Sequence, residues 1–326
     1  MGFGSWAVGG PWKFGWGPVD DDESVAAIRH AVERGVNWID TAAVYGLGHS
    51  EEVVGRAIQP FRGGEDVFVF TKCGRRSVGG PEGTIENDLR PSSIRQECED
   101  SLRRLGVERI DLYQFHWPDW TTGTALEESW ATMVELVDEG KVRWAGVCNF
   151  DVEQLARCEA VRHVDSVQPP LSLLARGARS TVVPWAAQHG TGVIVYSPMA
   201  SGMLTGAFDA ARIGRLDPDD WRRHSPLFSE PSLSRNLALV DRLRPLADRL
   251  GTTLPALAVA WTLAQPGVTG AIVGARLPRH VDGWLPGADL QLGDSELHEI
   301  DDALAETGAG SDDPPTPPPH MRPVKS

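Results

Sequence analysis

The strongest constraint on the fold is an alternation of short apolar runs with segments of helical periodicity, which continues through most of the 326 residues. Most of the apolar runs are apolar on both faces, as is typical of parallel strands covered by helices. Eight strands are expected in these runs, at 2–6, 37–41, 67–72, 110–116, 142–148, 165–168, 192–197 and 268–274.

Segments with helical periodicity lie between these strands, and the clearest are at 20–34, 92–104, 126–138 and 235–250. In the first of them, Asp20 and Glu23 have the spacing of a capping box. Strands joined through helices form right-handed βαβ units and a parallel sheet, and eight strands are enough to close a barrel. The sequence therefore predicts one α/β domain, a (β/α)8 TIM barrel over residues 1–307.

Two regions depart from this rhythm. Segment 200–233 is long, rich in Gly, Pro, Asp and Arg, and without a clear period, which predicts a functional lid or a disordered insert. The C-terminal segment 308–326 is rich in proline and is expected to be a disordered tail.

Composition narrows the classes of partner and the compartment. The net charge is −14 and no basic run stands out, which argues against nucleic acid and anionic membranes as partners. The four cysteines are scattered, with no CxxC pair and no histidine cluster beside them. This predicts no metal site and favours reduced thiols in the cytoplasm. The N-terminus lacks the pattern of a signal peptide, no stretch is long enough to span a membrane, and the oligomeric state stays open.

Polar residues stand at the C-terminal ends of three consecutive predicted strands, where barrel enzymes place their active sites. They are Asp40, Lys72 and His116, and Tyr45 follows Asp40 on the next loop. Taken alone, each has an ordinary structural explanation, such as a capping aspartate, a packed tyrosine, a surface lysine or a core histidine. Together they form a coherent set of groups for acid–base chemistry.

The chemistry this set suits is the reduction of a carbonyl group, whose oxygen must gain a proton. A free tyrosine has a pKa near 10, and an ammonium such as Lys72 beside Tyr45 is expected to lower it. Lys72 is costly to bury without a carboxylate, and Asp40 can supply one. His116 can donate a hydrogen bond that orients the substrate oxygen.

The sequence resembles the aldo-keto reductase family in motifs that reach to about residue 282. They are GVNWIDTAAVYGLGHSEEVVGRAI at 35–58, FTK at 70–72, YQFHWPD at 113–119, GVCNF at 146–150, SVQPPLSLL at 166–174, YSPMASGMLTG at 196–206 and AIVGAR at 271–276. The resemblance implies a barrel that reduces an aldehyde or ketone to an alcohol with NADPH. The catalytic residues of the family fall on Asp40, Tyr45, Lys72 and His116.

The resemblance also places an extended nicotinamide dinucleotide across the barrel mouth. Its contacts are expected from Ser5, Trp6, Cys148, Asn149, Gln168, Tyr196, Ser197, Pro198, Met199, Ser201, Leu204, Gly274, Arg276 and His280. In this scheme Asn149 and Gln168 bind the carboxamide, Tyr196 stacks on the nicotinamide ring, and 197–204 covers the pyrophosphate. Arg276 lines the adenosine phosphate pocket, so NADPH is expected rather than NADH.

The sequence departs from the family pattern at three places. Cys148 stands where the family usually has serine, and His280 followed by Asp282-Gly283-Trp284 replaces the usual adenine-side residues. The chain also begins at the expected first barrel strand, without the N-terminal hairpin that closes the barrel bottom in the family.

Tryptophans gather in the loops expected at the barrel mouth. Trp12, Trp117 and Trp120 are candidates for lining an apolar substrate pocket, although ordinary packing explains them equally well. The best-supported function is an NADPH-dependent carbonyl reductase that acts on a small-molecule substrate. The alternative is a non-catalytic, NADPH-sensing regulatory subunit on the same fold, because such subunits can retain the catalytic residues. A metal-dependent hydrolase would need clustered ligands, which are not found.

Overall fold

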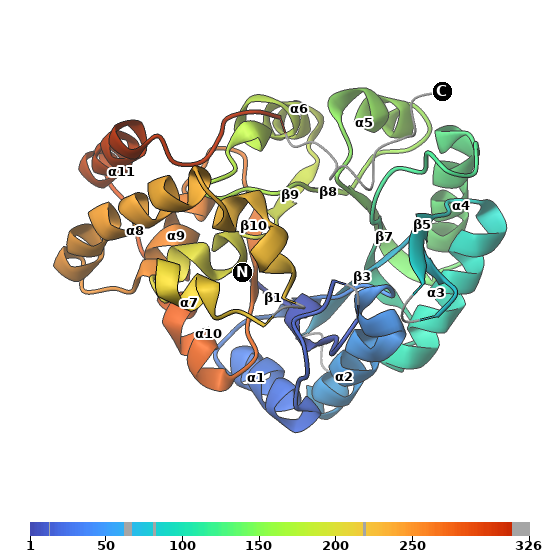
Figure 1. Ribbon diagram of the computed structural model, residues 1–326. Coiled ribbons are helices and arrows are strands. Elements are labelled where there is room, and N and C mark those ends of the chain that lie inside the picture. Colours follow the sequence, from blue (N-terminus) through green and yellow to red (C-terminus); the bar gives the residue numbers. More distant parts are fainter. Residues whose placement is uncertain (13, 62–66, 81–82, 218–219, 315–326) are drawn as a thin grey trace.

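The computed structural model describes residues 1–12, 14–61, 67–80, 83–217 and 220–314, which form a closed barrel of parallel strands ringed by helices (Figure 1). The barrel strands are β1 (Gly2–Gly4), β2 (Trp38–Asp40), β3 (Phe68–Cys73), β6 (Ile110–Phe115), β7 (Val142–Cys148), β8 (Ser166–Gln168), β9 (Gly192–Val195) and β10 (Gly270–Gly274). They follow one another around the barrel in chain order, and β1 pairs with both β2 and β10. The prediction of a (β/α)8 TIM barrel is confirmed.

The helices of the described residues are α1 (Asp21–Glu33), α2 (His49–Ile58), α3 (Pro91–Leu105), α4 (Leu126–Asp138), α5 (Val152–Glu159), α6 (Val182–His189), α7 (Ala210–Gly214), α8 (Ser232–Arg249), α9 (Leu254–Leu263), α10 (Pro278–Trp284) and α11 (Asp294–Thr307). Asp20 caps α1, because its carboxylate accepts from the backbone N–H groups of Asp22 at 2.8 Å and Glu23 at 3.1 Å. No helix among these is both long and apolar enough to cross a membrane.

An apolar layer fills the interior of the barrel. It consists of Trp38, Phe70, Leu112, Trp144, Ile194 and Ile272, together with Tyr196. The rings of Trp38 and Phe70 stack with their centroids 5.0 Å apart. Gly2 makes room for this layer, since a Cβ there would lie 2.2 Å from the Trp38 ring. Side chains two residues further along a strand point to the same face, so the next layer toward the C-terminal ends holds the polar groups of the site.

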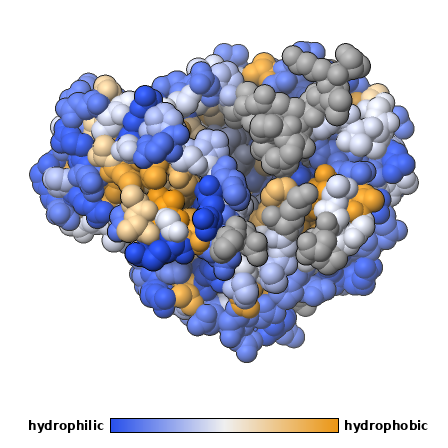
Figure 2. All heavy atoms as spheres, in the orientation of Figure 1, coloured by the Kyte–Doolittle hydropathy of each residue, from blue (hydrophilic) through white to orange (hydrophobic). Residues whose placement is uncertain are grey.

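A second apolar core lies outside the barrel, where α8, α9 and α11 pack together. Leu239, Leu246, Leu257 and Ile300 belong to it. In the space-filling view most of the visible surface is hydrophilic, and apolar residues gather over the region of α7, α8 and α9 (Figure 2). A third and larger apolar cluster, which includes Ile28, Val54 and Trp130, lies between the strands and the helices around them.

Of the two predictions for segment 200–233, a functional lid or a disordered insert, the described residues contradict the second, because they form regular turns and helices. The segment contains 3-10 turns at Ala200–Thr205, Trp221–His224 and Pro226–Phe228 as well as α7, and α8 begins at Ser232. Residues 218–219 lie outside the described residues. Such short turns have no sequence period, because tertiary contacts rather than an amphipathic face hold them in place.

The predicted disorder does not begin at residue 308. Ala309 is buried, and Arg176 pairs with Asp312 through its Nη2 at 2.8 Å and its Nε at 3.0 Å. Residues 308–314 are thus packed against the segment that follows β8, because an ion pair and a buried alanine offset the cost of ordering them. The proline-rich remainder, 315–326, lies outside the described residues.

A small antiparallel pair of strands stands outside the barrel, between β3 and α3. It is formed by β4 (Arg75–Val78) and β5 (Thr84–Asn87). Because β4 begins only two residues after β3 ends, this pair lies at the C-terminal edge of the barrel, the edge where the site is expected.

Candidate active site

A buried ion pair between Asp40 and Lys72 forms the base of the site. Asp40 is the last residue of β2, and Lys72 lies on the neighbouring strand β3. Lys72 Nζ donates to Asp40 Oδ1 and, at 2.8 Å, to the carbonyl of Thr41. Both side chains are almost fully excluded from solvent. The ammonium is therefore fixed in position by two acceptors, as a charge in a buried position must be.

The second carboxylate oxygen of Asp40 accepts from two glutamines that reach it from across the barrel. Gln168 Nε2 lies 3.0 Å from Asp40 Oδ2, and Gln114 Nε2 lies 3.4 Å from it. Gln168 also donates to Gln114 Oε1 at 3.1 Å. Gln114 was not singled out from the sequence. Its signal was available, because alternation along β6 puts it on the same face as His116.

Tyr45 comes from a tight turn, Tyr45–Gly48, that joins β2 to α2. The turn requires a glycine at position 46, where φ is +59° and a Cβ would lie 1.9 Å from the carbonyl oxygen of Gly9. It holds the Tyr45 ring among other rings, with centroids 5.6 Å from His116, 6.4 Å from Trp12 and 6.5 Å from Trp6. The phenol therefore lies at the barrel mouth.

The four predicted catalytic residues are brought together. Lys72 Nζ lies 5.5 Å from the centroid of the Tyr45 ring. His116, which packs edge-on against the same ring, is the first residue after β6. Burial, with the charges of Lys72 and Arg75, holds the pKa of His116 well below its usual range. His116 is thus a neutral imidazole at neutral pH, and one ring nitrogen can donate a hydrogen bond without releasing a proton.

The acidity of Tyr45 differs from the expectation drawn from Lys72. Burial raises the pKa of the Tyr45 phenol well above its usual range, with further increases from Asp40 and Cys148, while the charge of Arg75 lowers it. The sequence showed Lys72 and Asp40, but it did not show the desolvation of the phenol, which is the largest effect on its pKa. The phenol consequently stays protonated across the neutral range.

Arg75 is a site residue that sequence reasoning missed. It is only 7% exposed, and it stands three residues after Lys72. Its charge acts on Tyr45, His116 and Cys148, which belong to three different segments of the barrel mouth. Burial lowers the pKa of Arg75 to about 10, so it remains charged at neutral pH.

The side-chain amides expected to bind a nicotinamide lie beside these groups. Asn149 Nδ2 donates to the carbonyl of His116 at 3.0 Å, and the Tyr196 hydroxyl donates to Asn149 Oδ1 at 2.7 Å. The Cys148 thiol lies 3.6 Å from Gln168 Oε1 and 3.1 Å from Asn149 Nδ2. Cys148 therefore takes part in the amide network. Burial holds the pKa of the Cys148 thiol well above its usual range, and the group stays a neutral thiol.

The model of the aldo/keto reductase family matches residues 1–305 of this sequence. The chain belongs to the aldo/keto reductase family. The aldo-keto reductase YhdN of Bacillus subtilis (strain 168) is 35% identical over 308 residues, which cover 94% of this chain and 90% of that protein. The NADH-specific methylglyoxal reductase of Escherichia coli (strain K12) is 32% identical over 319 residues, covering 93% of this chain and 95% of that protein.

Solved structures agree with this assignment. The glycerol dehydrogenase of Gluconobacter oxydans shares 40% identity at a TM-score of 0.86, with 97% of this chain and 94% of that chain covered. An aldo-keto reductase from Klebsiella pneumoniae in complex with NADPH shares 28% identity at a TM-score of 0.69, with 99% and 92% covered. This aldo/keto reductase is therefore an oxidoreductase.

The loop after β9 carries an unusual backbone for residues other than glycine. Ser197, Ala200 and Ser201 have φ values of +59°, +48° and +57°, in the left-handed region. Side chains rarely adopt this conformation, and such strain concentrates at binding sites. In this aldo/keto reductase, the loop is the one expected to cover the cofactor pyrophosphate. Within this loop, Pro198 and Leu204 are buried, and Met199 packs against the barrel core.

The remaining predicted cofactor residues lie at the edges of the mouth. The Arg276 guanidinium donates to the carbonyls of Trp16 at 3.3 Å and Pro18 at 2.5 Å, and its own backbone N–H lies 3.4 Å from His280 Nδ1. Arg276 is thus anchored to the loop before α1, just beyond the exposed Gly274 at the end of β10. Two carbonyls do not exhaust the five N–H donors of a guanidinium.

Ser5 differs from the other cofactor candidates, because its hydroxyl is buried in a polar cluster. Ser50 Oγ lies 2.8 Å from Ser5 Oγ and 3.0 Å from Thr41 Oγ1. The Ser5 hydroxyl is therefore engaged within the protein, and it ties the end of β1 to α2.

An aromatic cluster covers one side of the mouth, and sequence reasoning missed part of it. Trp6 stacks on Trp221 with centroids 5.4 Å apart, and Trp16 packs edge-on against both. Trp221 comes from segment 200–233, so this segment reaches the mouth. A tryptophan in a polar, aperiodic segment was the available signal. Of the other predicted pocket residues, Trp117 and Trp120 pack edge-on against each other in the loop after β6.

Proposed function

We propose that this protein reduces an aldehyde or ketone to an alcohol with NADPH, and that Tyr45 donates the proton to the carbonyl oxygen. The observation that carries the proposal is the cluster at the barrel mouth: Tyr45 packed against a neutral His116, with the ammonium of Lys72 5.5 Å from the ring centroid. Burial keeps Tyr45 protonated until the substrate arrives, and the nearby ammonium of Lys72 eases release of the proton by stabilising the phenolate.

Each residue of the cluster has one task in this scheme. Tyr45 passes its proton to the substrate oxygen, and His116 donates a hydrogen bond to the same oxygen. Lys72 then stabilises the negative charge left on the tyrosine oxygen. Asp40, which accepts from Lys72 and two glutamines, holds the ammonium in place.

The residues at the mouth fit a nicotinamide dinucleotide in the chemistry of their donors. Asn149 and Gln168 offer amides, Tyr196 offers a flat ring, and the turn at 197–201 holds three left-handed residues, a backbone conformation found in anion-binding concavities. When bound, NADPH supplies the hydride that reduces the carbonyl carbon. The preference for NADPH over NADH rests on Arg276, since a fixed guanidinium suits a phosphate.

We propose further that the enzyme works in the reducing cytoplasm. All four cysteines are free and buried, so none of them stabilises the fold through a disulfide.

Tyr45→Phe tests the proposed role of the proton donor. This variant should bind NADPH normally yet lose about 10²–10⁴-fold in turnover with an aromatic aldehyde. Tyr113→Phe is the matched control, because Tyr113 is buried on β6 in the apolar core and its pKa is raised by burial and by Cys73 and Glu97 rather than by site groups.

The control should keep wild-type turnover. Turnover of Tyr45→Phe within about threefold of wild type would refute the role of Tyr45. A wild-type protein that binds NADPH but reduces none of a panel of aldehydes and ketones would instead favour the regulatory alternative.

A further inference from the structure

Glu51 is a buried carboxylate near the start of α2 that the proposed chemistry does not use. Its side chain is fully excluded from solvent, and both of its oxygens have partners. Oε2 lies 2.7 Å from Nε and 2.6 Å from Nη2 of Arg104 on α3, and Oε1 accepts from the Thr71 hydroxyl at 2.6 Å. A carboxylate is costly to bury, and the guanidinium and the hydroxyl together offset that cost.

Thr71 connects this carboxylate to the strand that carries Lys72. Successive side chains of a strand alternate between faces, so Phe70 and Lys72 point into the barrel while Thr71 points outward to the helices. Phe70 belongs to the apolar layer inside the barrel, and the Thr71 hydroxyl reaches Glu51, as this alternation requires. Glu51 therefore holds β3 from outside the barrel, at the residue directly before the lysine that carries the ammonium.

Arg104 connects the same carboxylate to the turn that carries Tyr45. The turn ends at Gly48, where φ is +104°. A Cβ at Gly48 would lie 2.7 Å from Cδ and 2.9 Å from Nε of Arg104, so the arginine side chain lies directly against the backbone of the turn. Nε is also one of the two atoms that bind Glu51. The position of the turn thus depends on where Glu51 holds the guanidinium.

Ser50, the residue before Glu51, makes a similar contact with the segment that follows β2. Its hydroxyl lies 3.0 Å from Thr41 Oγ1, and the carbonyl of Thr41 accepts from Lys72 Nζ at 2.8 Å. Ser50 and Glu51 are both fully buried. Two successive residues of α2 therefore hold the two chain segments between which the ammonium lies.

We propose that Glu51 is a positioning residue that sets the distance between the Lys72 ammonium and the Tyr45 ring. It does so by holding Thr71 on one side and Arg104 on the other. The inference rests on the proposed function, in which the ammonium stabilises the charge left on the tyrosine oxygen. That stabilisation weakens as the two groups move apart, and small displacements in an active site cost much of the rate. Stability alone is a poor explanation, because a buried ion pair can often be replaced by apolar side chains without loss.

The test separates a loss of placement from a loss of stability. Glu51→Gln keeps the shape and the acceptor for Thr71 but loses the charge, whereas Glu51→Ala loses both. Asp165→Asn is the matched control, because Asp165 Oδ2 also joins a strand to an arginine, accepting from Ala145 N at 2.9 Å and from Arg162 at 2.8 Å. It stands just before β8, at the end of the barrel opposite the mouth.

Each variant is assayed for kcat and KM with benzaldehyde, for NADPH affinity by fluorescence titration and for thermal unfolding. Glu51→Ala should lose about tenfold or more in kcat, while KM and the affinity for NADPH should change by less than about twofold. Glu51→Gln should recover part of this loss, because it keeps the contact with Thr71. Asp165→Asn should lower Tm yet keep the kcat of wild type.

A second measurement shows whether the effect passes through Lys72. Glu51→Ala is combined with Lys72→Met, and the cost of the first substitution is compared in the two backgrounds. Without the ammonium no distance is left to set, so Glu51→Ala should cost less than about twofold in kcat in the Lys72→Met background. Thr71→Val, which removes only the hydroxyl, should reproduce part of the loss and covers the case in which Glu51→Ala does not fold.

Variants of Glu51 and Thr71 that lower Tm but keep kcat within about twofold of wild type would overturn the proposal, since the ion pair would then be purely structural. A loss of kcat in Asp165→Asn as large as that in Glu51→Ala would overturn it too. So would an undiminished cost of Glu51→Ala in the Lys72→Met background. Failure of the proposed function looks different, because wild type would then reduce no aldehyde.

Discussion

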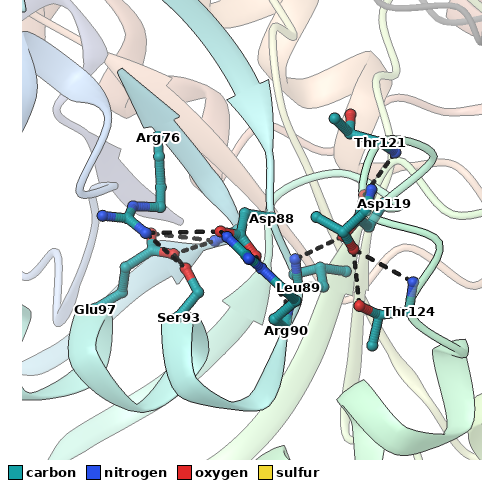
Figure 3. A network of polar contacts seen from close by, with 11 residues as sticks. Arg76, Asp88, Leu89, Arg90, Ser93, Glu97, Asp119, Thr121 and Thr124 are labelled. Carbon is teal, nitrogen blue, oxygen red and sulfur yellow. Dashed lines mark hydrogen bonds and ion pairs between the residues drawn. The ribbon is translucent and has the colours of Figure 1, made fainter. Parts of the chain in front are cut away.

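Replacing Glu97 with glutamine should change the pH dependence of stability in a predictable direction. The Glu97 carboxyl is 8% exposed and accepts from the Gly74 N–H and, at 3.2 Å, from the Ser93 hydroxyl (Figure 3). Burial raises its pKa to about 8, although both hydrogen bonds and the charge of Arg76 lower it. In the unfolded chain the same carboxyl has an ordinary pKa of about 4.5.

The sign follows from which state holds the proton. Between about pH 4.5 and pH 8, the folded protein keeps a proton on Glu97 that the unfolded chain releases. The free energy of unfolding must therefore fall as pH rises through this window. One pKa unit corresponds to about 1.4 kcal/mol, so the loss is on the order of 3–5 kcal/mol.

Glu97→Gln keeps the shape of the protonated carboxyl and cannot ionise, so it should escape this loss. Denaturant unfolding from pH 5 to pH 8 should show the variant gaining stability relative to wild type at each step. Glu99→Gln serves as the control, because Glu99 is a half-exposed neighbour on the same helix, paired with Lys141. If the curves of wild type and Glu97→Gln run parallel, Glu97 does not carry a raised pKa and the reasoning is refuted.

Two further predictions concern the site. Asp40→Asn and Lys72→Met should each lower turnover, and the double variant should be little worse than Lys72→Met, because Asp40 acts through Lys72. A double-variant cycle in kcat measures this, and losses that simply multiply would contradict it. Arg276→Ala should weaken NADPH binding by about ten- to a hundredfold, while NADH binding should change little. Titration with both cofactors measures this, and equal losses of affinity for NADPH and NADH would exclude a contact between Arg276 and the phosphate.

The architecture could be predicted because strands and helices that bury one face carry apolar residues at regular intervals along the sequence. Strand β7 has the expected bounds, Val142–Cys148, and α4 begins and ends where its apolar spacing indicated, at Leu126–Asp138. Short 3-10 turns such as Trp221–His224 leave no such trace, since contacts with distant residues hold them. The stacking of Trp221 on Trp6 is one of these contacts.

The site could be predicted where chemistry and topology coincide. Asp40 and Lys72 stand at neighbouring strand ends, so their meeting followed from the barrel itself. Arg75 and Arg76 were a different case, because nothing in the sequence told which of two adjacent arginines would turn inward. That choice depends on the left-handed turn at Gly74 and on its contact with Glu97, which lies 23 residues further along the chain.

Inside the barrel, a layer of polar side chains lies directly above a layer of apolar ones. Trp38 and Phe70 stack inside the barrel, and Asp40 and Lys72 stand two residues further along the same strands, on the same face. Replacing a buried ion pair by apolar side chains is often neutral or even stabilising, so stability alone does not explain the change from rings to charges. The lower layer shows that this barrel can be filled with apolar groups. We therefore propose that the ion pair is retained for its role at the mouth, where it fixes an ammonium beside Tyr45.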